Sequence, residues 1–88
     1  MTPEIENLRQ KIDSIEDSLI SLLNERAKYV LEIGRIKKTQ GLPVADSKRE
    51  GLILKRVAEK NPGPMSNEFM VDVFKKIIDE SIKLESKF

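Results

Sequence analysis

The sequence has no cysteine, no histidine and no tryptophan, and its aromatic residues are one tyrosine and three phenylalanines. Without cysteine the chain has no disulfide bond, no thiolate nucleophile and no cysteine ligand for a metal. Without histidine it lacks the commonest metal ligand and the usual general base near neutral pH. These absences exclude serine–histidine–aspartate hydrolysis, zincin-type hydrolysis and zinc-finger folding. We expect neither a metal nor a cofactor.

An excess of one charge is also missing, because 16 lysines and arginines face 15 aspartates and glutamates, which leaves a net charge of +1. This balance gives no general attraction to nucleic acid or to an acidic membrane. No apolar run approaches the roughly 20 residues that span a bilayer. The first residues, MTPEIENL, are acidic where a signal peptide would be basic. We therefore expect a cytoplasmic protein that binds neither nucleic acid nor membranes.

The apolar residues recur with a helical period, and no segment alternates with period two over the length of a strand. This pattern predicts an all-α domain over residues 1–88 with helices at about 3–38, 47–60 and 66–87. Thr2 and Ser66 are suitable N-caps, and so are Asp46 or Ser47, the latter at capping-box distance from Glu50. Gly41 and Pro43 would end the first helix. The third helix is expected to bury Met70, Val73, Phe74, Ile77, Ser81, Leu84 and Phe88.

The first predicted helix is unusually long, and an arginine interrupts its apolar stripe. About 35 residues at about 1.5 Å each make a helix of roughly 50 Å, whereas a compact chain of this size is about 30 Å across. Gly34 weakens this helix by only about 1 kcal/mol. The simplest cover for the overhang is a second copy, with two first helices packed antiparallel in an intertwined homodimer. An extended helical hairpin in a larger assembly is the alternative. The stripe comprises Ile5, Leu8, Ile12, Ile15, Leu19, Leu22, Arg26, Tyr29, Ile33 and Ile36.

Arg26 and Lys37 fall within about 20° of each other on the helical wheel, with Cα atoms about 16 Å apart along the axis. Two inward cations at this spacing could hold a small anionic metabolite. Arg9 lies about 25 Å from Arg26 along the helix, so it would reach this pocket only from the partner of an antiparallel dimer. Alternatively, Arg26 sets the register of a coiled coil or pairs with a glutamate, Lys37 is a C-terminal helix cation, and Arg9 is solvated.

Further polar side chains cluster at the start of the second helix and at the end of the third. Ser81 occupies a core position, and a hydrogen bond to its own helix would explain it as well. Glu85 lies one turn beyond Ser81, at the edge of the same face, where it could equally be solvated. The cluster at the start of the second helix comprises Asp46, Arg49 and Glu50. N-capping and a capping box alone would account for Asp46 and Glu50.

Four stretches resemble, in order and spacing, the all-helical chorismate mutases. They are LRQKID, LLNERAKYVLEIGRIK, PVADSKRE and FKKIIDESIKLE, and the similarity runs from about Ile5 to Glu85. The resemblance implies conversion of chorismate to prephenate, the branch step toward phenylalanine and tyrosine. It also implies an intertwined dimer of three-helix chains with two active sites.

Carried over to this sequence, the resemblance implies that Arg26 and the partner chain's Arg9 bind the two carboxylates of chorismate. Lys37 would donate to the ether oxygen of the breaking bond, and Glu85 falls where the family has a second donor to that oxygen. Many family members have glutamine there, and a glutamate donates only when protonated. Burial beside the substrate's carboxylates would favour the protonated form, so we expect activity to fall as the pH rises.

The remaining roles implied by the resemblance concern substrate binding. Glu50 would accept a hydrogen bond from the ring hydroxyl, assisted by the backbone near Asp46, and Arg49 and Ser81 would support the carboxylate end. The reaction is a one-substrate rearrangement that needs no nucleophile, metal or redox group, which suits a chain without histidine and cysteine. Catalysis then depends on holding the compact conformer and stabilising charge on the ether oxygen.

Three other functions are compatible with the sequence. An isochorismate pyruvate-lyase uses a similar cationic pocket, although the adjacent Arg49 and Glu50 favour the mutase. The chain could instead be a regulatory domain fused to, or associated with, another shikimate-pathway enzyme, and GPMSNEF resembles the mutase part of prephenate dehydratase fusions. The third possibility is a helical dimerisation module without catalytic activity.

Overall fold

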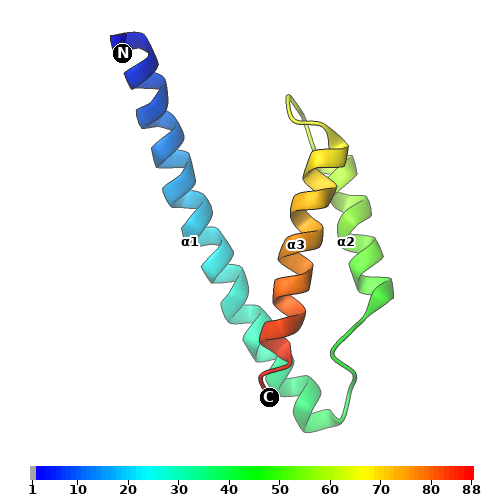
Figure 1. Ribbon diagram of the computed structural model, residues 1–88. Coiled ribbons are helices and arrows are strands. Elements are labelled where there is room, and N and C mark those ends of the chain that lie inside the picture. Colours follow the sequence, from blue (N-terminus) through cyan, green and yellow to red (C-terminus); the bar gives the residue numbers. More distant parts are fainter. Residues whose placement is uncertain (1) are drawn as a thin grey trace.

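The computed structural model describes residues 2–88, which form three α-helices and no strand. They are α1 (Pro3–Gln40), α2 (Ser47–Lys60) and α3 (Asn67–Glu85). α3 lies between the other two helices and packs against both (Figure 1). The predicted all-α fold with a long first helix is confirmed.

Side-chain caps define where the helices begin. Thr2 accepts a hydrogen bond from the Ile5 N–H, and Ser66 accepts one from the Phe69 N–H. At α2 the N-cap is Asp46, whose carboxylate accepts from the Arg49 N–H at 3.0 Å. The capping box expected between Ser47 and Glu50 is therefore wrong, because Ser47 already lies inside the helix.

The bounds of α2 agree with the predicted 47–60, whereas the end of α1 and both ends of α3 differ from the prediction by one or two residues. α1 continues to Gln40 because Gly41 adopts the left-handed conformation, with φ of 68°, and its N–H reaches the last carbonyls of the helix. α3 begins at Asn67, directly after its cap, and ends at Glu85 rather than at residue 87.

The core lies mainly between α2 and α3, where Ile53, Val57 and Ile78 are buried. Ile78 was not among the residues that we expected α3 to bury, and Val73 and Phe88 of that set are exposed. The reason is that α3 contacts a helix on each side, so one narrow stripe cannot serve both contacts. Partly buried residues complete the cluster, namely Leu54, Met70, Phe74 and Ile82.

The N-terminal half of α1 diverges from α2 and α3, and its end projects beyond them (Figure 1). The principal extents are 57 × 23 × 15 Å, and the long axis matches the length of a 38-residue helix. The buried residues of α1, Val30 and Gly34, both lie in its C-terminal half. The stripe is therefore not buried within one chain, since every apolar member, from Ile5 to Ile36, is exposed. Within residues 2–88, no helix is long and apolar enough to cross a membrane.

Candidate active site

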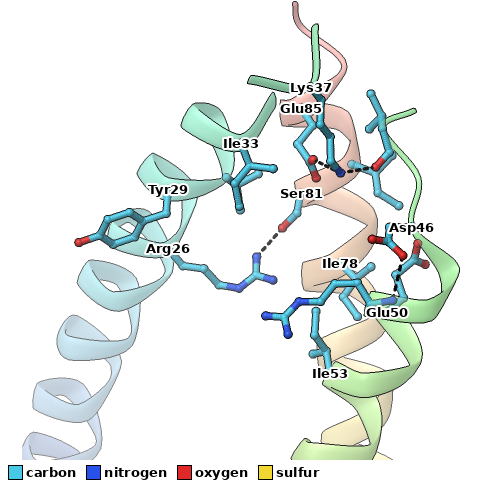
Figure 2. Close-up of a pocket in the computed structure, with 14 residues that line it drawn as sticks. Arg26, Tyr29, Ile33, Lys37, Asp46, Glu50, Ile53, Ile78, Ser81 and Glu85 are labelled. Atoms are coloured by element: carbon cyan, nitrogen blue, oxygen red, sulfur yellow. Dashed lines mark hydrogen bonds and ion pairs between the residues drawn. The ribbon is translucent and has the colours of Figure 1, made fainter. Parts of the chain in front are cut away.

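A cavity of about 420 Å³ lies between the C-terminal half of α1, the beginning of α2 and the end of α3. Its size is in the range of small-molecule sites. Figure 2 shows polar side chains from all three helices pointing into this space. Seven of the eight predicted site residues line it: Arg26, Lys37, Asp46, Arg49, Glu50, Ser81 and Glu85.

Arg26 is held in place from α3. Its Nη1 donates a hydrogen bond to Ser81 Oγ, and Ser81 Oγ donates to the Ile77 carbonyl of its own helix at 2.7 Å. Ser81 is buried, so its hydroxyl fixes the guanidinium at the cavity wall (Figure 2). The expected bond of Ser81 to its own helix is confirmed, and the hydroxyl additionally serves Arg26.

The surroundings of Arg26 are unfavourable to its charge. Burial lowers the pKa of Arg26, and the nearby Arg49 and Arg56 charges lower it further, whereas Glu85 raises it. The guanidinium nevertheless stays protonated at neutral pH, because an arginine does not lose its proton in a protein. An anion bound in this cavity would relieve the destabilisation.

Lys37 and Glu85 form an ion pair across α1 and α3, with Lys37 Nζ 2.6 Å from Glu85 Oε1. Lys37 Nζ also donates to the Val44 carbonyl at 2.7 Å. Both side chains are largely buried. Among residues 2–88, Glu85 Oε1 accepts no hydrogen bond of good geometry, so the close Lys37 charge is what compensates its burial. An ammonium has three donors and the Val44 carbonyl accepts from one, so Lys37 can still donate to a bound molecule.

The start of α2 supplies the opposite wall. Capping fixes the Asp46 carboxylate, and Arg49 and Glu50 follow in the first turn of the helix. Asp46 and Arg49 are exposed, and Glu50 is half-buried. This wall can therefore both accept and donate hydrogen bonds at the mouth of the cavity.

Arg9 lies outside this cavity, in the part of α1 that extends beyond α2 and α3. Its side chain is exposed, and its Nη1 is 3.8 Å from Glu6 Oε1. Arg9 precedes Arg26 by seventeen positions along the helix, which corresponds to about 25 Å. The structure therefore does not bring Arg9 to the site of its own chain.

Two features of the site were not predicted, namely the Val44 carbonyl and most of the apolar wall. Val44 lies in the segment between α1 and α2, and a backbone acceptor leaves no mark in the sequence. Ile53, Ile78 and Ile82 line the cavity as well as contributing to the core. None of the three was among the residues that we expected to be buried, and helical spacing alone could not show that one edge of the core is open to a ligand. In residues 2–88 no cluster of acidic side chains is arranged to hold a metal ion.

Residues 8–86 match the family profile of chorismate mutase type II. The chain belongs to this family. Its fold agrees, because the solved structure of chorismate mutase (form II) from Thermus thermophilus superposes with a TM-score of 0.92. That protein is 38% identical, and the match covers 94% of both chains. Chorismate mutase from Helicobacter pylori, solved in complex with prephenate, gives a TM-score of 0.88 at 30% identity over 98% of this chain and 93% of that one.

The similarity to curated sequences concerns one part of longer proteins. A bifunctional chorismate mutase/prephenate dehydratase from Stutzerimonas stutzeri is 34% identical over 93% of this chain. The chain spans about a quarter of the length of such relatives, since the match covers 24% of that protein. The match to this family of chorismate mutases therefore covers the three-helix unit described above.

Proposed function

We propose that the chain catalyses the rearrangement of chorismate to prephenate in the cavity between its three helices. The observation that carries this proposal is that three cations, Arg26, Lys37 and Arg49, line one cavity of metabolite size. Chorismate is a dianion, and two of these cations, Arg26 and Lys37, are partly shielded from water, which strengthens their binding to carboxylates. Family membership and the similarity to a mutase solved with prephenate support the same substrate.

The reaction breaks the ether C–O bond as a new C–C bond forms within one molecule, with no atom gained or lost. The site contributes in two ways. Arg26, fixed by Ser81, binds a carboxylate and thereby favours the compact conformer in which the reacting carbons meet. Lys37, fixed by Glu85 and the Val44 carbonyl, directs its remaining N–H toward the ether oxygen, where negative charge develops.

The polar wall at the start of α2 fits the remaining substrate groups. Glu50 accepts from the ring hydroxyl near the capped end of α2, beside Asp46. Arg49 supports the carboxylate end together with Arg26, and the two cations lie close enough for the charge of Arg49 to lower the pKa of Arg26. An anion between the two guanidinium groups offsets this repulsion.

We further propose that the active form is an antiparallel homodimer in which the partner's first helix brings Arg9 to this cavity. The exposed stripe on α1, from Ile5 to Ile36, is the surface that a second copy would cover. Monomers rarely leave so extended an apolar face in water. Arg9 lies on the overhanging half, where an antiparallel partner passes the cavity of the other chain.

A mixing experiment tests this arrangement. Arg9→Ala and Arg26→Ala variants are each expected to be nearly inactive, whereas a refolded equimolar mixture should recover about a quarter of wild-type activity. Half of the dimers would then be mixed, and each mixed dimer would have one site with both arginines. A mixture as inactive as its components would contradict a shared site. Wild type mixed with the Arg9→Ala/Arg26→Ala double variant provides the control for chain exchange, because a mixed dimer of these two has no complete site and activity falls from about half to about a quarter of wild type when the chains exchange.

The role of Glu85 has its own test in the pH dependence. A neutral carboxyl donates to the ether oxygen, whereas the carboxylate does not, so kcat at saturating chorismate should fall with rising pH if Glu85 serves as a donor. Glu85→Gln is expected to flatten the profile, because an amide donates at any pH. A flat wild-type profile would show that Lys37 is sufficient as the donor at this oxygen.

The assay that tests the function itself follows chorismate consumption by the purified chain and identifies the product. Prephenate is the expected product. Pyruvate and salicylate formed from isochorismate would instead identify a lyase, and no turnover of either substrate would favour a helical dimerisation module. Since related sequences carry a prephenate dehydratase on the same chain, we also propose that this unit works beside the enzyme that consumes prephenate.

A further inference from the structure

We propose that Gly34 is a positioning residue that holds Lys37 and Glu85 at contact distance where α1 crosses α3. Gly34 is buried at this crossing. A Cβ added to it would lie 2.7 Å from Glu85 Cα and 3.0 Å from the Glu85 carbonyl oxygen. The Phe88 ring would be 3.2 Å away. The absence of a side chain, rather than an unusual backbone angle, is what this position requires.

The closest neighbours of the missing Cβ belong to the backbone of Glu85. A clash with backbone atoms cannot be relieved by rotating a side chain, so the end of α3 would have to move away from α1. Lys37 follows Gly34 by three residues on the same face of α1, about 4.5 Å along the axis. The two helices therefore lie close together beside the ion pair, whose 2.6 Å contact depends on that approach.

The inference rests on the proposed function, in which Lys37 and Glu85 face the ether oxygen. Arg26 lies eight residues before Gly34, about 12 Å along α1, and is fixed through Ser81. A displacement at the end of α3 should therefore disturb the ether-oxygen end of the cavity more than the carboxylate end. It should lower kcat and leave KM nearly unchanged.

The experiment compares Gly34→Ala with Gly51→Ala. Both replace a helical glycine by alanine, but an added Cβ at Gly51 meets no atom within 4 Å. Gly34→Ala is expected to lower kcat on the order of tenfold to a hundredfold, the effect of a misplacement of about 1 Å. Gly51→Ala should keep wild-type kcat and unfold at a slightly higher temperature, because alanine is the better helix former. Wild-type kcat for Gly34→Ala would overturn the proposal.

A second comparison separates positioning from general loosening of the fold. In a Glu85→Ala background there is no carboxyl left to position, so Gly34→Ala should change kcat less than about threefold. An equal loss in both backgrounds would overturn the proposal. If Gly34→Ala is unfolded by circular dichroism even when combined with Gly51→Ala, the residue is required for folding as a whole, and the positioning role is again refuted.

A readout independent of activity keeps this inference distinct from the proposed function. Urea unfolding of Lys37→Met, Glu85→Gln and the double variant gives the coupling between the two side chains. The coupling should be clear with Gly34 present and disappear in the Gly34→Ala background. If the wild type turned over no chorismate, the proposed function would be refuted. The coupling free energy between Lys37 and Glu85 would still show whether Gly34 holds the two side chains together. A coupling that survives Gly34→Ala would refute that role.

Discussion

Replacing Arg26 with leucine is expected to lower kcat/KM for chorismate by at least about 10²–10³-fold without destabilising the chain. The loss follows from removing a fixed, charged donor at the cavity wall, which Ser81 holds by a hydrogen bond. Stability should be unchanged or higher because burial and the Arg49 charge disfavour the cation in the folded state, as its lowered pKa shows. Leucine removes that charge and keeps an apolar stem, while Ser81 retains its bond to Ile77.

The measurement combines steady-state kinetics with urea unfolding of the same preparation. Arg35→Leu serves as the matched control, since Arg35 lies on the same helix but is exposed and does not line the cavity. A variant that gains stability and keeps its activity would identify Arg26 as a register-setting residue of a helical scaffold. If Arg26 belongs to a binding site, Arg26→Leu should lower kcat/KM while the free energy of unfolding stays the same or rises. The reason is that the charge binds the ligand and does not stabilise the fold.

Replacing Lys37 with methionine should have a comparably large effect on kcat, again at least about 10²–10³-fold. Unlike the Arg26 change, it should also lower the free energy of unfolding, by roughly 1–3 kcal/mol. The reason is that Glu85 Oε1 is buried and the Lys37 ammonium 2.6 Å away is its compensating charge. Lys38→Met is the control, because Lys38 is the next residue of α1 and is exposed.

The double variant Lys37→Met/Glu85→Gln separates the two effects. Glutamine carries no charge to bury, so stability should return close to that of wild type. Activity should remain low, because the cationic donor to the ether oxygen is still missing. If the double variant recovered activity together with stability, Lys37 would act only by keeping the fold intact, and its place in the mechanism would be wrong.

Local sequence signals were sufficient for the helices and for most of the site. Caps at Thr2 and Ser66, with the terminator Gly41, marked helix ends to within one or two residues, since capping depends on a few neighbouring atoms. Helical spacing also placed Arg26 and Lys37 on one face, and both line the cavity. The capping box at α2 failed because Asp46 and Ser47 are both good caps, and sequence alone did not choose between them.

Contacts between helices were not predictable in the same way. Ile78 was missed because α3 is covered from two sides, which only the arrangement of α1 and α2 reveals. The ion pair of Lys37 with Glu85 joins residues 48 positions apart, and no periodicity encodes such a pairing. Gly34 was taken only as a weak point of a helix, although the backbone of Glu85 lies where its Cβ would be.

The amino-acid sequence alone determined the helical class, the length of α1 and the chemistry that the side chains could offer, because these depend on residue type and on spacing along one helix. The crossing of α1 with α3 decided which polar groups meet and how closely. Distances across helices depend on packing, and here packing depends on the smallest residue at the crossing. The same packing leaves the stripe from Ile5 to Ile36 outside the core of one chain, since α1 buries Val30 and Gly34 in its C-terminal half and not the residues of the stripe.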